Sequence, residues 1–453
     1  MGQGKSLLIT SIGNPLAYKP TTYSYQGKSK KGCVSSVVFD DVNTVFFVGL
    51  ASFTDVQTKT QGACSSSKQN NECATEMLDV LKDYQGKKYN SYTQLENDAE
   101  EALQKYAENK FRNVHAIVIP PLGKPGENYT FRFPPDTAST MLLLKLYQKC
   151  GEDVFTRIVV DLTHGVNFLP TLCLKVAKLI SEIMLVRSQD KVVIEAYNAD
   201  PYKENVAEQE VNLVHREVVE NLTYYTLLQE QKPVEGGDLR RLNQEDLRGL
   251  NPNQDEINKM HSASKYLLKT LAYPYPLALA YASEYFKKNS NLNELNTLVN
   301  RVLESVEWSD KTAKTQYKIN TLSVFQIILA HEVSKKVSEI AEWCDGYTLN
   351  SVKDLAQLYK LVAKPYSILI EHEISEIEKR LKSDFKGTLG ELYGDKDTSN
   401  QMDKRIMVAH AGFQKEFVYI EGGKVAYYHN NQKMDPKNDE HQKLLRGLIS
   451  ATF

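Results

Sequence analysis

The feature that most constrains the fold is an alternation of strand-like and helix-like segments over the first 200 residues. The strand-like runs are short, β-branched and almost continuously apolar, as expected for strands that are buried on both faces. Strands that alternate with helices predict an α/β domain with a mainly parallel, doubly wound sheet. The expected strands are residues 6–12, 44–50, 114–120, 157–162 and 191–197, and the expected helices are 71–84, 92–110, 135–150 and 166–185.

The second half of the chain has a different character. Residues 208–228 are amphipathic and fit either a helix or a strand, and QKPVEGGD at 231–238 is typical of a linker, since it carries a proline and a glycine pair. Beyond it, nearly every segment has a helical pattern. We therefore expect an α/β domain at 1–200, a linker region at 201–238 and an α-helical domain at 239–453. The helices expected in the last of these are 255–289, 292–306, 310–343, 352–384 and 437–450.

Composition excludes several classes of protein. A formal charge of −2 and a pI of about 6.5 leave no global basic field for nucleic acid, so any RNA or DNA would be held locally. No segment approaches roughly 18 consecutive apolar residues, and the N-terminal apolar run is too short for a signal peptide. The six cysteines form no Cys-x-x-Cys pair, so neither zinc nor a disulfide framework is predicted. We expect a cytoplasmic protein with no metal and no cofactor.

Three short motifs resemble known sites without meeting their requirements. GQGKS at 2–6 ends in Gly-Lys-Ser, but it lacks the upstream glycine of a phosphate-binding loop and precedes a strand. HEVSK at 331–335 and HEISE at 372–376 lack the second histidine of a zinc protease helix. We interpret both as solvated helix positions.

Two loops follow expected strands at the edge where open parallel sheets bind ligands. SIGNP at 11–15 is rich in small residues that let a backbone approach a ligand closely. DLTHGVNFLP at 161–170 gathers several polar residues before a helix whose free N–H groups favour an anion. Thr163 and Asn167 would also serve as plain helix caps. Capping needs one polar side chain, however, and this loop supplies several, so we favour a binding site.

These two loops on an α/β domain resemble the CARF domain of CRISPR-associated proteins, and the resemblance covers roughly residues 1–200. It implies a Rossmann-like sensor domain, two copies of which hold a cyclic oligoadenylate across a twofold axis. It also implies contacts to phosphates, riboses and adenines, without fixing which residue makes which. The positions that match the family's loops are Ser11, Gly13, Asn14, Thr163, His164, Gly165 and Asn167.

The helical domain resembles HEPN, whose nucleases carry an arginine and a histidine with four to six residues between them. RIMVAH places Arg405 and His410 with four residues between them, near the end of this domain. The whole chain is therefore similar to the CARF–HEPN ribonucleases that act beside type III CRISPR effectors, the Csx/Csm ancillary group. Many HEPN motifs have a polar residue directly after the arginine. Ile406 stands there in this chain, so Arg405 and His410 would act with little side-chain support.

The two residue types suit metal-independent RNA cleavage. Histidine transfers protons near neutral pH, which is worth roughly 10²–10⁴ in rate. Arginine stays charged and matches phosphate oxygens with its planar fork. Our hypothesis is that His410 is the general base or acid, that Arg405 stabilises the scissile phosphate, and that the products carry a 2′,3′-cyclic phosphate and a 5′-hydroxyl.

Helical geometry adds a constraint on this site. Five residues of a regular α-helix turn through roughly 500°, which leaves the two side chains about 140° apart. A single helix would not bring both to one phosphate, whereas two helices that meet across a twofold axis would. We therefore expect a homodimer or a higher homo-oligomer.

A β-hairpin interrupts the helical pattern at 415–430, where two aromatic, β-branched arms flank Glu-Gly-Gly-Lys. It is either a plain two-stranded insertion, which is marginal unless it packs on something, or a support for dimer or higher assembly, or an RNA contact. The side chains that would supply the packing are Phe417, Tyr419, Tyr427 and Tyr428.

The leading hypothesis is a single-strand endoribonuclease that a cyclic oligoadenylate activates in antiviral defence, with cyclic tetra-adenylate the activator that the resemblance implies. An alternative is a ligand-sensing CARF regulator without nuclease activity, although no Lys/Arg-rich recognition helix is present. A third possibility, which is compatible with the first, is a phosphodiesterase that degrades the cyclic ligand at the sensor site with His164.

Overall fold

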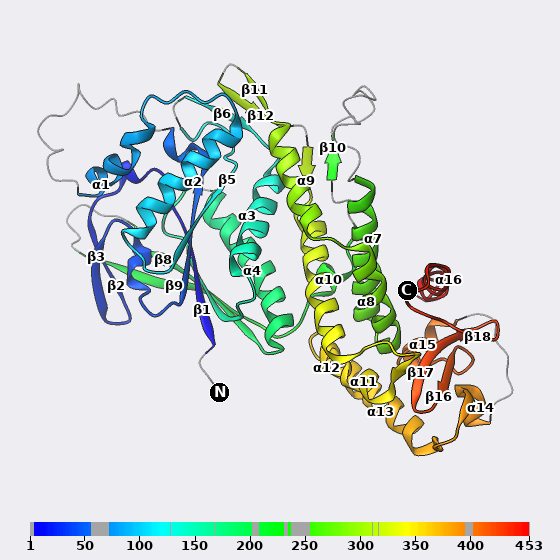
Figure 1. The fold of residues 1–453 in the computed structure, drawn as a ribbon. Helices are drawn as coiled ribbons and strands as arrows, with labels where there is room; N and C mark the ends of the chain where they lie inside the picture. The colour runs from blue at the N-terminus through cyan, green and yellow to red at the C-terminus, as the bar shows by residue number, and fades with distance from the viewer. Residues whose placement is uncertain are drawn as a thin grey trace, which may run out of the picture.

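The computed structural model describes residues 4–55, 72–126, 128–166, 168–201, 208–230, 234–236, 254–309, 311–315, 317–394 and 402–452. An α/β half carries the N-terminus, a mainly helical half carries the C-terminus, and the two lie side by side (Figure 1). No helix among these residues combines the length and the apolar character needed to cross a membrane.

The α/β half is built on an eight-stranded sheet in the order β3-β2-β9-β8-β7-β1-β4-β5. Strands β8, β7, β1, β4 and β5 run parallel, which confirms the predicted mainly parallel sheet. They are the strands expected from the apolar runs, and their interior residues are almost all buried. Their bounds are Lys5–Ser11 (β1), Thr44–Leu50 (β4), Val114–Ile119 (β5), Phe155–Asp161 (β7) and Val192–Ala199 (β8).

Helices cover both faces of this sheet, as right-handed crossovers between parallel strands require. Helix α2, with α1 beside it, packs on one face, and α3 and α4 pack on the other (Figure 1). Helix α4 also packs on helix α10 of the helical half. Residues 180–186 of α4 are therefore all buried, which explains its long apolar sequence, whereas Thr171, Lys175 and Lys178 in its first half are exposed. The bounds are Glu72–Leu81 (α1), Tyr92–Glu108 (α2), Pro135–Cys150 (α3) and Phe168–Ser188 (α4).

The sheet also contains elements that the apolar pattern does not reveal. The ambiguous segment 208–228 forms strand β9 (Glu208–Val219), antiparallel to β8, and the short helix α5 (Tyr224–Leu228). Both lie within the region expected as a linker. An antiparallel pair, β2 (Thr21–Tyr25) and β3 (Lys28–Gly32), completes the far edge. These two strands are rich in Thr, Ser, Tyr and Lys and are only partly buried, so they lack the apolar run used to predict strands.

Cys33 and Cys73 are joined by a disulfide, with their Cα atoms 5.6 Å apart. The cysteine spacing did not indicate this bond, because its partners lie 40 residues apart in sequence. Cys33 follows β3, and Cys73 lies in the first turn of α1, so the bond attaches that helix to the edge of the sheet.

The second half is mainly helical, as predicted, but several expected helices are shorter than the pattern suggested. The segment 255–289 divides at Pro274 and Pro276, because proline supplies no N–H for a continuous helix. The prediction for 310–343 was wrong at its start, where β12 and β13 precede the helix. The segment 352–384 also breaks, into the end of α11, α12 and α13. The bounds are Gln254–Ala272 (α7), Pro276–Asn289 (α8), Asn293–Glu304 (α9), Glu307–Ser309 (β11), Thr312–Lys314 (β12), Tyr317–Ile319 (β13), Thr321–Ile340 (α10), Leu349–Asp354 (α11), Ala356–Tyr359 (α12) and Lys364–Arg380 (α13).

The predicted hairpin is confirmed as β16 (Val418–Glu421) and β17 (Lys424–His429). It is paired on both sides, since β15 adds to β16 and both β14 and β18 add to β17. The hairpin is thus the centre of a small sheet with a buried face, which gives it the packing that an isolated pair of strands would lack. The neighbouring elements are Tyr347–Thr348 (β14), Lys386–Thr388 (β15), Leu389–Tyr393 (α14), Lys404–Ala409 (α15), Gln432–Lys433 (β18) and Asp439–Ser450 (α16).

A buried ion pair joins the two halves. Arg187, at the end of α4, contacts Glu332 of α10 at 2.6 Å, and both side chains are at most 6% exposed. The hydroxyl of Tyr147 on α3 donates to the same carboxylate oxygen at 2.7 Å. Glu332 belongs to HEVSK, so the interpretation of that motif as a solvated helix position was wrong for this residue. A glutamate is buried here because a neighbouring domain supplies its partner.

Pairing between two short strands joins the halves a second time. Strand β12 of the helical half pairs in parallel with β6 (Thr130–Arg132) of the α/β half, with Ala313 opposite Phe131. The indole of Trp308 on β11 donates to the carbonyl of Tyr89 at 2.9 Å. Near the linker, β10 (Val234–Gly236) pairs with β13.

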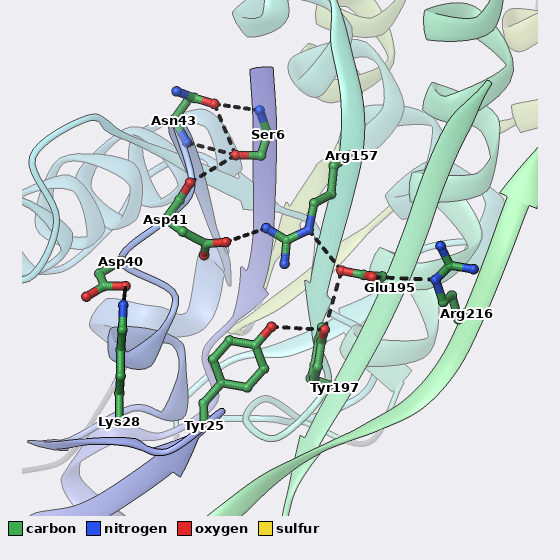
Figure 2. Close-up of polar contacts among 10 residues, drawn as sticks. All are labelled: Ser6, Tyr25, Lys28, Asp40, Asp41, Asn43, Arg157, Glu195, Tyr197 and Arg216. Carbon is green, nitrogen blue, oxygen red and sulfur yellow. Dashed lines mark hydrogen bonds and ion pairs between the residues drawn. The ribbon is translucent and has the colours of Figure 1, made fainter. Parts of the chain in front are cut away.

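A polar network ties the strands of the α/β sheet together (Figure 2). Arg157 on β7 lies between Asp41, at 2.6 Å, and Glu195 on β8, at 2.9 Å. Glu195 also contacts Arg216 on β9 at 3.6 Å. Each of these charges has an opposite partner within the network, so we assign it a structural role.

Candidate functional site

The two sensor-like loops meet at the carboxyl ends of β1 and β7, which are neighbouring parallel strands. Ser11 is the last residue of β1, and its buried hydroxyl donates to the carbonyl oxygen of His164. Asp161 is the last residue of β7, and its carboxylate accepts from the Ser35 hydroxyl at 2.7 Å and from the Thr163 N–H at 3.0 Å. The structure therefore brings together the loops that the sequence analysis selected separately.

Two glycines allow this approach. A Cβ atom on Gly13 would lie 3.1 Å from the carbonyl carbon of Gly165, so the two loops touch through their backbones. Gly165 itself has a φ of +118°, and a Cβ there would lie 2.7 Å from the Ser11 hydroxyl oxygen. Any larger residue at Gly165 would meet the Ser11 side chain and adopt a backbone conformation that favours glycine.

The His164 ring lies against the fold. Its Nε2 atom is 3.0 Å from the backbone N–H of Ser35 and 3.3 Å from the Tyr23 hydroxyl. The Tyr18 ring packs on it with centroids 4.7 Å apart. Since a backbone N–H only donates, Nε2 accepts, and the neutral ring carries its proton on Nδ1. Burial lowers the pKa of His164, which keeps this neutral form near pH 7. His164 therefore shapes the loop, and this geometry does not favour it as a proton-transfer group.

The other residues of the sensor site play local roles. The Thr163 hydroxyl accepts from the N–H of Ala199 at 2.9 Å, which anchors the loop to the end of β8. The Asn14 side chain is exposed and accepts from the Leu16 N–H at 3.1 Å. The Tyr18 hydroxyl accepts from the Gly13 N–H at 2.8 Å, and burial raises the pKa of Tyr18 to about 12. Asn167 lies outside the described residues.

The second candidate site lies on α15, a helix of six residues. A helix this short is not stable alone, so its neighbours must hold it. Asp403 caps its start by accepting from the N–H groups of Arg405, at 2.7 Å, and Ile406, at 3.3 Å. The N–H of Asp403 donates to the buried Gln414 side chain at 2.9 Å, which closes the loop around the helix. Met407 is fully buried beneath it.

His410 lies at the end of this helix and not within it, since α15 ends at Ala409. Ala411 and Gly412 take positive φ values of 49° and 78°, and the Gly412 N–H donates to the Met407 carbonyl at 2.7 Å. This is the Schellman pattern that ends helices. The prediction of one longer regular helix through both motif residues was therefore wrong at His410. The Phe413 N–H donates to the His410 carbonyl at 2.8 Å, so the backbone of His410 is held on both sides.

The partner of the His410 ring was missed by sequence reasoning. Its Nδ1 atom lies 3.2 Å from a carboxylate oxygen of Glu373 on α13. Glu373 is 17% exposed and His410 is 47% exposed, so the carboxylate lies beneath a ring that reaches solvent. Glu373 belongs to HEISE, which was interpreted as solvated. The sequence held no local signal, because the two residues are 37 positions apart.

The matches to known proteins cover both sites. Residues 7–201 match the family described as CRISPR system endoribonuclease Csx1, CARF domain, and residues 363–430 match the Csx1 HEPN domain. The second match includes Glu373, Arg405 and His410. A curated relative from Methanocaldococcus jannaschii, described as CRISPR system endoribonuclease Csx1, is 24% identical over 444 residues. That alignment covers 92% of this chain and 86% of the relative. This chain belongs to the CRISPR-associated CARF–HEPN ribonuclease family.

The HEPN motif residues have separate partners. The Arg405 side chain is 93% exposed, and among the described residues its Nε atom pairs with the Asp403 carboxylate, at 3.8 Å. Because the Arg405 guanidinium is so exposed, a ligand from outside the chain can reach it. His410 is turned toward Glu373 instead.

Cations and aromatic rings surround the HEPN motif. The Arg380 guanidinium lies 4.7 Å from the centroid of the Tyr393 ring, and the Lys415 ammonium lies 5.0 Å from it. The Lys404 ammonium lies 5.3 Å from the Tyr273 ring. Cation–aromatic clusters of this kind suit the phosphates and bases of a single strand. Arg380, Lys404 and Lys415 thus supply cations near this motif, where the carboxylates of Glu373 and Asp403 also lie.

Proposed function

We propose that this chain is a metal-independent endoribonuclease that cleaves single-stranded RNA in type III CRISPR defence when cyclic tetra-adenylate binds its CARF domain. The observation that carries the proposal is the geometry of the HEPN motif. Arg405 is exposed on a capped helix, and the partly exposed His410 ring has the Glu373 carboxylate at its Nδ1 atom. The residue types supply the charge and the proton transfer that the reaction needs.

In the proposed reaction, His410 takes the proton of a ribose 2′-hydroxyl, and the 2′-oxygen attacks the adjacent phosphorus. The bond to the 5′-oxygen breaks, and that oxygen receives a proton from the second histidine of a dimer or from water. The products are a 2′,3′-cyclic phosphate and a 5′-hydroxyl. Arg405 donates to the phosphate oxygens as charge develops on them, a contribution that typically is worth roughly 10²–10³ in rate.

A dimer is part of this proposal. Within one chain Arg405 and His410 have different partners, so a second copy would complete the phosphate site. Two exposed isoleucines support it: Ile406 beside Arg405 is 42% exposed, and Ile368 on α13 is 59% exposed. We propose that these two isoleucines belong to the dimer interface. Many HEPN motifs have a polar residue directly after the arginine. In this chain Ile406 occupies that position, where it would contact the partner subunit.

The sensor part of the proposal rests on the two loops that meet at Gly13 and Gly165. Ligand contacts there would move the loop from which α4 starts, and α4 ends at the ion pair with α10. For such a ligand to activate the nuclease, it must bind the active arrangement more tightly than the inactive one. The inward-facing His164 ring gives less support to ligand degradation at this site.

The test is RNA cleavage in EDTA with and without cyclic tetra-adenylate, using labelled single-stranded RNA. Wild type should cleave only with the ligand, His410→Ala should not cleave, and the products should carry 2′,3′-cyclic phosphates. Cleavage that His410→Ala leaves undiminished would overturn the assignment of the site. Ligand-dependent DNA binding without cleavage would instead identify a regulator.

A further inference from the structure

We infer that Glu373 is a positioning residue that holds the His410 ring in the tautomer and orientation needed for proton transfer. The inference rests on the proposed ribonuclease function, and it assigns a role to a residue outside the Arg–His motif. The observation is the contact between His410 Nδ1 and the Glu373 carboxylate at 3.2 Å.

The chemistry of the contact fixes the proton. An ionised carboxylate only accepts hydrogen bonds, so the Nδ1 atom that faces Glu373 must donate. In the neutral ring the lone pair then lies on Nε2, on the side of the ring away from α13. An Nε2 lone pair that faces the substrate is what a general base requires. Without the carboxylate, the neutral ring would be free to carry its proton on either nitrogen.

The surroundings of His410 fix its backbone but leave the orientation of its ring to Glu373. The backbone of His410 is held by the helix end on one side and by Phe413 on the other, so only the side-chain rotation stays to be set. Glu373 is mostly buried on α13, and Ile374 and Ile370 on the same helix are fully buried. Because α13 is well packed, the Glu373 carboxylate can hold the His410 ring, which lies on a short and partly exposed segment, in one orientation.

The experiment measures the tautomer and the rate separately. In protein with ¹⁵N-labelled histidine, the His410 ring resonances are assigned from the spectrum of His410→Ala. Wild type should show the Nδ1–H tautomer, and Glu373→Ala should shift His410 toward Nε2–H. Glu373→Gln, whose amide oxygen also accepts, should keep the wild-type tautomer. In activated cleavage, kcat should fall about 10–100-fold in Glu373→Ala with KM unchanged, as for other groups that orient a reactive histidine.

Glu378→Gln is the matched control, because Glu378 lies on the same helix and pairs with Lys353. It should change neither kcat nor the His410 spectrum. The inference is overturned if His410 has the same tautomer in wild type and Glu373→Ala, or if kcat is unchanged in Glu373→Ala. The tautomer measurement needs no substrate, so it decides the role of Glu373 even if wild type proves inactive on RNA. If the alanine variant does not fold, Glu373→Leu, which also lacks an acceptor, takes its place in both measurements.

Discussion

Arg187 and Glu332 form a buried ion pair across the junction between the CARF half and the helical half, at 2.6 Å. Arg187 ends the helix that starts beside the sensor loop, and Glu332 lies on the longest helix of the other half. The pair therefore joins the ligand end of the chain to the body that carries the HEPN motif.

Removing one partner of this pair should be strongly destabilising. Arg187→Met leaves the Glu332 carboxylate buried without its cation, which costs about 3–5 kcal/mol in comparable pairs. The double variant Arg187→Met/Glu332→Leu should recover much of that loss, since both charges are gone. Urea unfolding of the wild type and both variants measures this. Equal stability of wild type and Arg187→Met would show that the pair contributes little.

Arg405 should matter for catalysis and not for folding. Its side chain is 93% exposed, so Arg405→Ala should leave the melting temperature unchanged. Activated kcat should fall roughly 10²–10³-fold, the cost of losing one donor to the transition state. Arg405→Lys should restore only part of the rate, because a lysine cannot donate through two parallel N–H groups. Full activity in the lysine variant would argue against a bidentate contact.

Gly165→Ala should weaken ligand binding. The added Cβ would meet the Ser11 hydroxyl at 2.7 Å in a backbone conformation that alanine rarely adopts. The Ser11 side chain must shift away from the His164 carbonyl that it bonds, so the Kd for cyclic tetra-adenylate measured by calorimetry should rise about tenfold, or 1.4 kcal/mol. Gly86→Ala is the control, because Gly86 also has a positive φ, of +72°, but has open space around it. Equal effects of the two variants would mean that backbone strain alone is responsible.

Glu182 should make stability depend on pH. Its buried carboxylate on α4 accepts from the Thr226 hydroxyl at 2.8 Å, and burial raises its pKa to about 7. The unfolded chain loses this proton near pH 4.3, so the stabilisation is complete below that pH and is lost as pH rises toward 7. Relative to Glu182→Gln, the wild-type free energy of unfolding should fall by roughly 3 kcal/mol between pH 4.3 and 7. If the free energies of unfolding of wild type and Glu182→Gln, measured with urea, change in parallel with pH, the prediction is contradicted.

Ile368→Lys should dissociate the proposed dimer. Ile368 is 59% exposed on α13, and a lysine there adds a charge that an apolar interface would have to desolvate. Sedimentation velocity should show a monomer, and RNA cleavage should fall with the dimer fraction. Leu444→Lys, at a 40% exposed leucine on α16, is the control and should leave the assembly unchanged. A wild-type monomer that is fully active would remove the need for a second copy.

Sequence reasoning succeeded where a local pattern carries the information. The run TVFFVGL predicted a strand that is buried on both faces, and the loops DLTHGVN and SIGNP, which the sequence selected separately, lie together in the structure. It failed where the burial of a residue depends on a partner that is distant in sequence. Glu332 and Glu373 look like solvated glutamates on helices, and only Arg187 and His410, brought close by folding, explain why they are buried.

The same reason explains the missed secondary structure. Strands β12 and β13 have three residues each, too few for a period to be visible, and they form because β6 and β10 offer them hydrogen bonds. Arg405 and His410 were predicted to lie on one regular helix, but α15 ends at Ala409. Ala411 instead adopts a left-handed conformation in which Gly412 bonds to Met407.

The pairing of β12 with β6 limits how this protein can be divided. A fragment that begins after the linker would leave the β11–β12 hairpin with an unpaired edge and expose Ala313, which is fully buried in the whole chain. Unpaired edges recruit strands from other molecules, so such a fragment should self-associate during preparation. Exchange of the sensor half between homologues would meet the same obstacle, because the incoming half must provide a strand that matches this hairpin in register. The two halves are therefore expected to diverge together, as one inherited unit.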